Sequence, residues 1–81
     1  MLFRSSPLVA VVAGTFPHRS LADKEMAALR AKGFAPYIVR VGPAFQVRLG
    51  AFAVRSNAER LAAAAKAKGF AVRLVQVPAP P

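Results

Sequence analysis

The sequence predicts an α+β fold of the βαββαβ, ferredoxin-like (RNP-like) type, with a four-stranded antiparallel sheet and two helices on one of its faces. The first observation behind this prediction is an internal repeat: the pentapeptide AKGFA occurs at residues 31–35 and again at 67–71, an offset of 36 residues. The second is the length of the chain. With 81 residues in total, neither copy of the repeat could bury a sizeable core alone.

The repeat extends well beyond the pentapeptide, because residues 11–41 align with residues 47–77 at the same offset. Identical pairs include Val11 and Val47, Gly14 and Gly50, Phe16 and Phe52, Ser20 and Ser56, Gly33 and Gly69, and Phe34 and Phe70. We therefore expect one domain over residues 8–77, built from two βαβ repeats at 8–41 and 45–77. Residues 1–7 are expected to form an N-terminal extension, and the proline-rich residues 78–81 a tail.

The first expected strand is LVAVVAGTF at residues 8–16. Together with MLFRSSP before it, this stretch imitates a secretory signal, with one arginine, a short apolar run and then small residues. We favour the strand, because the segment at 14–16 matches the segment at 50–52 and cleavage there would remove half of a repeat. No run approaches the roughly 18 apolar residues of a membrane span, so this segment is not expected to insert into a membrane.

A helix is expected after the first strand of each unit. Ser20 and Ser56 are the predicted N-caps, because a serine oxygen can accept from the free amides of the first turn. Asp23 and Glu59, three residues further on, would complete a capping box in each unit.

Each helix is expected to end within the repeated pentapeptide, at about Lys32 and Lys68. Basic side chains suit the negative end of the helix dipole, and Gly33 and Gly69 can take the left-handed conformation that follows a helix. The phenylalanine after each glycine is then expected to enter the core. The apolar stripes predicted to face the sheet are Ala22, Met26 and Leu29 in the first helix and Ala58, Leu61, Ala62 and Ala65 in the second.

The remaining strands are expected at residues 35–41, 45–52 and 71–77, with a turn at Val41-Gly42-Pro43 joining the two units. Right-handed crossovers place both helices on one face of the sheet, with the first and third strands in the centre. The opposite face is left open.

Period-two alternation sorts the strand residues between the two faces. The side chains expected to point away from the helices are Val12, Tyr37, Val39, Gln46, Arg48, Arg73 and Val75. A face that mixes valines and a tyrosine with arginines and a glutamine is typical of a binding surface. The alternative is that the valines only satisfy strand propensity.

Charge and composition limit the possible functions. The chain has 12 Lys and Arg against three acidic residues, a net charge of +9, which favours an anionic partner such as nucleic acid, anionic lipid or an acidic glycan. No cysteine is present, so disulfides and thiolate metal sites are excluded. The single histidine, His18, lies in an expected turn, and no paired carboxylates are expected in a cleft. We therefore expect no catalytic residues, metal or cofactor.

The segments VVAGTF at 11–16 and VRLGAF at 47–52, the helix segment NAERLA at 57–62 and the repeated KGF resemble the SPOR domain, the sporulation-related repeat of bacterial cell-envelope proteins. The resemblance covers about residues 8–77. It implies a βαββαβ fold whose sheet binds peptidoglycan glycan strands lacking stem peptides, without catalysis. It also implies that the domain carries its host protein to the division site. We expect this host to be a longer protein of the periplasm or cell envelope, and the domain to be a monomer.

The strand motifs of the family can be compared with this chain position by position. On the third strand, where the family often has an aromatic residue, Arg and Val, this chain has Phe45, Gln46 and Val47. On the first strand the family's frequent Gln is replaced by Val12. The glycan-binding residues implied are Gln46 and Arg48 first, then Thr15, Tyr37 and Arg73, with Val12, Val39 and Val75 as apolar contacts.

Two other functions compete with glycan binding. RRM-like binding of single-stranded RNA uses the same fold, and Lys32-Gly33-Phe34-Ala35 copies the start of the RNP1 motif. RNP1 belongs on the third strand, however, whereas this segment follows a helix and recurs after the second one. Dimerisation through the open sheet, with Val12, Val39 and Val75 along the contact, is the structural alternative.

Overall fold

The computed structural model describes residues 7–77, and its elements follow the predicted order. They are β1 (Leu8–Phe16), α1 (Arg19–Ala31), β2 (Tyr37–Val41), β3 (Ala44–Phe52), α2 (Arg55–Ala67) and β4 (Arg73–Val77). The strands form one antiparallel sheet in the order β2-β3-β1-β4, which confirms the βαββαβ fold with the first and third strands in the centre. Except for Pro7, the predicted N-terminal extension and the tail at 78–81 lie outside the described residues.

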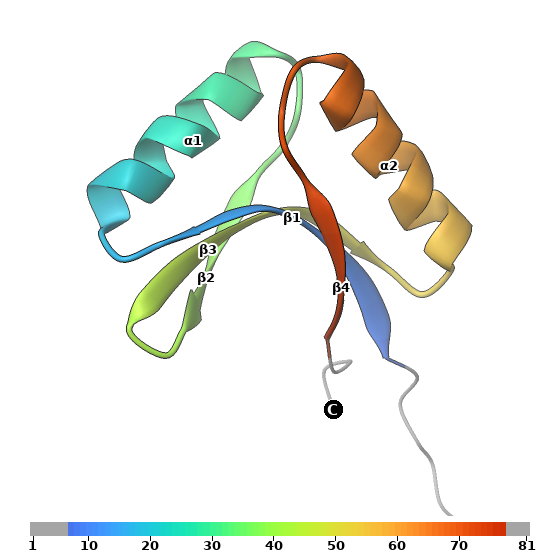
Figure 1. Ribbon diagram of the computed structural model, residues 1–81, viewed down its shortest axis with the longest axis horizontal. Helices are drawn as coiled ribbons and strands as arrows, with labels where there is room; N and C mark the ends of the chain where they lie inside the picture. The colour runs from blue at the N-terminus through green and yellow to red at the C-terminus, as the bar shows by residue number, and fades with distance from the viewer. Residues whose placement is uncertain (1–6, 78–81) are drawn as a thin grey trace, which may run out of the picture.

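Both helices lie on one face of the sheet, and the sheet bends away beneath them (Figure 1). The apolar stripes predicted from the sequence are the ones that pack. Residues with no exposed surface include Val11 and Val47 of the central strands. The buried helix residues are Ala22, Met26 and Leu29 of α1 and Ala58, Ala62 and Ala65 of α2. Because most of these helix side chains are small, the helices can approach the sheet closely.

The repeated AKGFA segment ends both helices in the same way. Gly33 and Gly69 have φ angles of 92° and 95°, in the left-handed region that favours glycine. In the first copy, the N–H of Phe34 donates to the carbonyl of Leu29 at 3.1 Å, and the N–H of Gly33 donates to the carbonyl of Arg30 at 3.0 Å. This pair of bonds is the Schellman motif, and the second copy repeats it.

The two phenylalanines that follow these turns join the two units. The rings of Phe34 and Phe70 meet edge to face, with centroids 6.2 Å apart and planes at 90°. Both rings also pack against the buried core. The C-terminal ends of α1 and α2 accordingly converge in space (Figure 1), so the repeated pentapeptide serves both the helix ends and the contact between the units.

The predicted N-caps at Ser20 and Ser56 are wrong. The N-cap residues are His18 and Val54, and neither side chain makes a capping hydrogen bond. The carbonyl of His18 already accepts from the N–H of Leu21 at 3.2 Å, so Ser20 lies inside the first turn rather than before it.

The acidic residues of the predicted capping boxes have other partners. Asp23 pairs with Arg19 at 3.6 Å, and Glu59 pairs with Arg55 at 3.2 Å. Each pair spans four residues on an exposed helix surface and contributes about 0.3–0.5 kcal/mol. The sequence pattern was therefore correct for a helix start but wrong about the interaction that stabilises it.

The glycine and phenylalanine of each Gly-x-Phe segment pack against each other. A Cβ added to Gly14 would lie 2.8 Å from the ring of Phe16, and one added to Gly50 would lie 3.2 Å from the ring of Phe52. Each ring therefore folds back over the glycine two residues earlier, on the same side of its strand. Here the glycine leaves room for the ring, and neither Gly14 nor Gly50 has a positive φ angle.

The edge strands are shorter than predicted. β2 begins at Tyr37 and β4 at Arg73, two residues later than the segments 35–41 and 71–77 predicted. The predicted turn at 41–43 is a tight hairpin in which Val41 pairs with Ala44, and Gly42 has a φ of 58°. No helix within residues 7–77 is long and apolar enough to cross a membrane.

Replacing Gly33 by alanine tests the role of the left-handed turn. We expect Gly33→Ala to lower the free energy of unfolding by about 1–2 kcal/mol, since alanine is strained at this φ angle. Gly33→Asn should lose less, because asparagine enters this region more readily. Urea denaturation measures both. Equal losses for the two variants would argue against backbone strain as the cause.

Candidate functional site

The candidate site lies on the face of the sheet that no helix covers, here called the open face. The strand pairings align Tyr37 on β2 with Arg48 on β3, Arg48 with Val12 on β1, and Val12 with Arg73 on β4. Paired residues of neighbouring strands share a face, so these four side chains form a row across all four strands. The row lies opposite the core residues Val11 and Val47, as predicted from alternation.

A second row runs beside the first. Val39 on β2 pairs with Gln46 on β3, and Gln46 pairs with Thr15 on β1. Val75 lies further along β4, opposite Ala10. The structure thus places every predicted site residue on the open face, whereas contact of these residues with a ligand stays a prediction.

Gln46 links the two rows through its side-chain amide. Its Nε2 donates to the hydroxyl oxygen of Thr15 at 3.3 Å, and its Oε1 accepts from the Nε of Arg48 at 2.6 Å. Gln46 is only 7% exposed, and Arg48 is half-buried. The short bond uses the Nε–H of Arg48, so the two terminal nitrogens of its guanidinium group remain as further donors.

An irregularity in the central strands determines where Thr15 points. The register of β1 against β3 shifts on both sides of the Val12–Arg48 pair, which leaves Ala13 and Leu49 without a partner in this ladder. An extra residue reverses the alternation of the strand that carries it. Thr15 therefore lies on the open face, although strict alternation from Val12 would turn it toward the helices.

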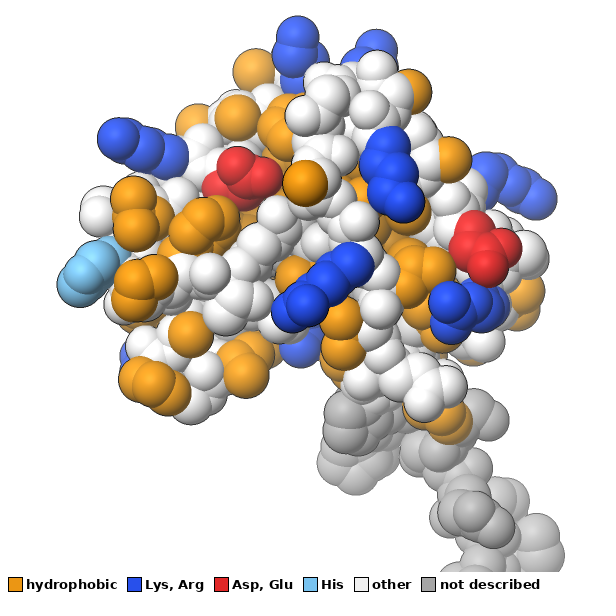
Figure 2. Space-filling view, viewed as in Figure 1, with side chains coloured by type: hydrophobic (Ala, Val, Ile, Leu, Met, Phe, Trp, Pro, Cys, Tyr) orange, Lys and Arg blue, Asp and Glu red, His pale blue; other side chains and the backbone are white. Residues whose placement is uncertain are grey.

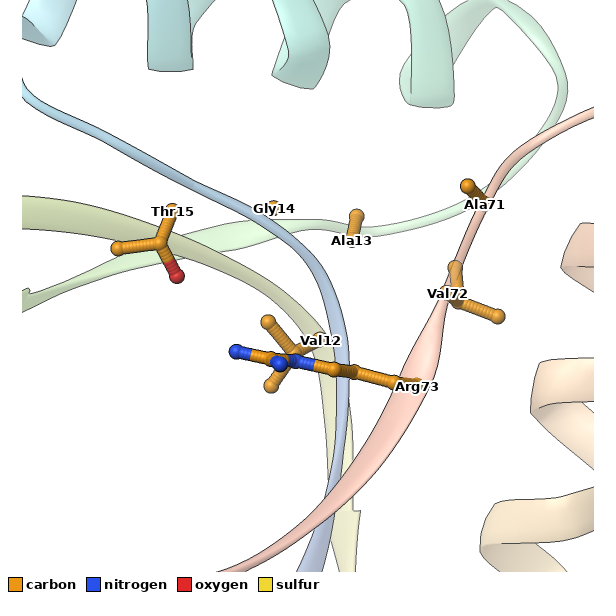
Figure 3. A pocket seen from close by; sticks show the side chains of 7 residues that line it. All are labelled: Val12, Ala13, Gly14, Thr15, Ala71, Val72 and Arg73. Carbon is orange, nitrogen blue, oxygen red and sulfur yellow. The ribbon is translucent and has the colours of Figure 1, made fainter.

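Val12 forms an apolar base for the site rather than an exposed contact. It is 2% exposed, although no helix lies over it. Arg48 and Arg73 flank it on the two neighbouring strands, and Figure 3 shows the side chain of Arg73 extending across it. The alkyl parts of arginine commonly cover apolar surface in this way, while the charged ends stay in water.

The open face carries positive charge without negative charge. The three acidic residues of the chain are Asp23, Glu25 and Glu59, and all of them lie in the helices. In Figure 2 basic side chains appear over the helices and the sheet, whereas acidic side chains appear only over the helices. An anion approaching Arg48 or Arg73 on the open face therefore meets no acidic side chain there.

The pairing of β1 with β4 stops at Val12 and Arg73, and the two strands separate beyond this point. A hollow of about 360 Å³ opens between them, lined by Val12, Ala13, Gly14 and Thr15 from β1 and by Ala71, Val72 and Arg73 from the β4 side (Figure 3). Sequence reasoning missed this hollow and the role of Ala71. No local pattern marks it, because it depends on where two distant strands separate.

The residues with acid–base or metal-binding side chains are few and lie apart from one another. Within residues 7–77 no group of three or more histidine or acidic side chains lies close enough together to hold a metal ion. His18 is exposed at the start of α1, away from the open face. The geometry is that of a binding surface: an ordered arginine, an exposed arginine and an edge tyrosine beside an apolar base.

Comparisons with known proteins agree with this geometry. The profile described as SPOR domain matches residues 42–79, which contain the second repeat. The chain is also similar to the solution structure of the peptidoglycan binding domain of the B. subtilis cell wall lytic enzyme CwlC, with 33% sequence identity and a TM-score of 0.80. That match covers 94% of this chain and 96% of the other. No curated protein matches in sequence.

The chain therefore belongs to the SPOR domain family, as the sequence resemblance implied. The match to the family profile begins at Gly42, after the first repeat. The structural match covers nearly all of the chain, so the similarity in fold extends over both repeats.

The bond between Arg48 and Gln46 can be tested in the free protein. Gln46→Leu keeps the size of the side chain but removes the acceptor of the Arg48 Nε–H. We expect the Nε–H NMR signal of Arg48 to exchange with water faster in this variant than in the unaltered protein, because the 2.6 Å bond is lost. The exposed Arg60 of α2 provides an unaffected reference signal. Unchanged exchange at Arg48 would show that Gln46 does not orient it.

Proposed function

We propose that this domain binds peptidoglycan through its open face, without catalysing a reaction, and that it prefers glycan strands from which the stem peptides have been removed. The observation that supports this most directly is the cationic row across the sheet, Tyr37-Arg48-Val12-Arg73, on a face with no acidic side chain. The similar domain of CwlC is described as a peptidoglycan binding domain, which points to the same polymer.

The chemistry of the polymer fits such a row. Removing a stem peptide leaves the lactyl carboxylate of each muramic acid free, so a stripped strand carries regularly spaced negative charges. Arg48 and Arg73 can each bind a carboxylate through two parallel N–H groups. Because Gln46 already fixes the Nε of Arg48, less side-chain freedom is lost when a carboxylate binds.

The uncharged residues of the site suit the sugar rings. Tyr37 lies on the edge strand, is 39% exposed and can stack on a sugar face while its hydroxyl donates a hydrogen bond. Val39 and Val75 are half-buried and offer apolar contact on either side of the row. Gln46 and Thr15 act in this proposal mainly by positioning Arg48.

Binding of this kind would give the domain a targeting role. Stripped strands arise where amidases act on the wall, so a domain that prefers them would carry a longer host protein to the division site. The expected location is the periplasm or cell envelope. We expect the domain to act as a monomer, because the same open face that would join two copies is the one proposed for glycan.

RNA binding through the same face has weaker support. RRM-like recognition stacks bases on aromatic residues of the central strands. Phe16, Phe45 and Phe52 of the central strands pack against the core instead, and among residues 7–77 only the edge residue Tyr37 presents an aromatic ring on the open face. The segment Lys32-Gly33-Phe34-Ala35 follows α1 and is not part of β3.

A pulldown with purified sacculi tests the proposal. Sacculi treated with amidase should retain more of the domain than untreated sacculi, because only the treated strands expose lactyl carboxylates. Retention should also fall as salt rises, since the contacts are ionic and accessible to solvent. A filter-binding assay with single-stranded RNA runs in parallel. Equal retention on both kinds of sacculi, or binding to RNA alone, would contradict the proposal.

Reversing one charge locates the site. Arg48→Glu should weaken retention on treated sacculi by about tenfold or more, because it replaces an attraction with a repulsion on the open face. Arg60→Glu is the matched control, since it makes the same change of charge at an exposed position of α2. Thermal unfolding shows whether both variants keep the fold. Equal retention of the two variants would remove Arg48 from the site.

A further inference from the structure

The hollow between β1 and β4 connects with the open face but extends beyond it. Of its lining residues, Val12, Thr15 and Arg73 lie on the same face as the proposed glycan site. Ala13 and Val72, which also line it, pack against the core on the helix side. The hollow therefore leads from the open face into the space between the separating strands.

The walls of the hollow combine polar main chain with small apolar side chains. Beyond Val12, residues 13–16 of β1 have no partner strand on the β4 side, so the main-chain groups along this edge are not used in a ladder there. Ala13, Ala71 and Val72 supply the apolar surface. The only charged residue in the lining is Arg73.

The repeat helps to explain why space remains at this position. In the second unit a Cβ on Gly50 would lie 3.3 Å from Leu61, because that leucine of α2 packs over the glycine. The residue of α1 at the equivalent position is Glu25, and the three atoms nearest to a Cβ on Gly14 all belong to Phe16. The first unit therefore lacks the leucine that contacts the equivalent glycine in the second.

We propose that the hollow is a subsite for the acetamido group of an N-acetylated amino sugar, an inference that rests on the proposed binding of glycan. An acetamido group has one N–H, one C=O and one methyl group, which match a free strand edge and small apolar side chains. A volume of about 360 Å³ is ample for this group and part of its sugar ring.

The position of the hollow also favours this group over a carboxylate. A sugar lying on the row next to Val12 would direct one substituent between β1 and β4, while Arg48 and Arg73 remain available to carboxylates at the surface. A carboxylate inside the hollow would contact mostly uncharged groups and would lose its hydration. The neutral acetamido group loses less hydration free energy, and the free main-chain groups of β1 can replace its hydrogen bonds to water.

Filling the hollow tests the subsite. Ala71 is an exposed residue of the hollow, and its repeat equivalent Ala35 does not line it. Ala71→Phe should bind amidase-treated glycan strands about tenfold more weakly than the unaltered domain, because one or two hydrogen bonds and a methyl contact are lost. Ala35→Phe, the matched control, should bind as the unaltered domain does. Circular dichroism and thermal unfolding check that both variants fold.

Changing the acyl group of the glycan shows whether Ala71→Phe weakens binding by filling the hollow or by disturbing the rest of the open face. Treated strands are de-N-acetylated and then re-acylated with either acetyl or benzoyl groups, so that the two products carry the same charge. The unaltered domain should bind the acetyl product about tenfold more tightly than the benzoyl product, whereas Ala71→Phe should bind both alike.

The possible failures are distinguishable. If the unaltered domain binds the acetyl and benzoyl products equally, or if Ala71→Phe keeps full affinity for the acetyl product, the subsite is wrong while glycan binding stands. If Ala71→Phe weakens binding but keeps the preference for acetyl, the hollow does not hold the acetamido group. If the unaltered domain binds no treated strands, the proposed function fails, and the subsite fails with it.

Discussion

The structure depends on the packing of two short helices against one shared sheet. Each unit of the repeat provides a helix with a narrow apolar stripe and two strands, which is too little to bury a core. When the units associate, Val11 and Val47 of the central strands become fully buried beneath both helices. Both helices lie on one face of the sheet, so the opposite face is free to bind a ligand.

The repeat gives both halves of the site the same arrangement of strands, and sequence differences between the two copies give the halves different side chains. At the repeat offset Arg48 is the equivalent of Val12, and Arg73 is the equivalent of Tyr37. The row across the open face therefore consists of two equivalent pairs that have become different. A glycan strand has a direction along its length, so a face with different groups on its two halves can distinguish one direction from the other.

The irregular part of β1 has more than one effect on the open face. The register shift at Val12 turns Thr15 toward Gln46, which in turn holds Arg48. Just beyond the same residue β4 leaves β1, and the hollow opens there. Bulges and unpaired strand edges are common near binding sites because they direct side chains and main-chain groups away from the regular ladder. Here both features lie within one short segment of a central strand.

The sequence by itself determined the order of the elements, the C-terminal ends of the helices and the division of most strand residues between the two faces. These features depend on local hydrogen bonding and on periodicity, and both can be read along the chain, as the Schellman turns at Gly33 and Gly69 show. The predicted caps at Ser20 and Ser56 failed because each helix has its N-cap two residues earlier, at His18 and Val54, which places both serines inside the first turn. Only the tertiary structure decided the orientation of Thr15, the burial of Val12 and the existence of the hollow. Each of these depends on how distant strands pair, shift and separate under the two helices, which no short stretch of sequence specifies.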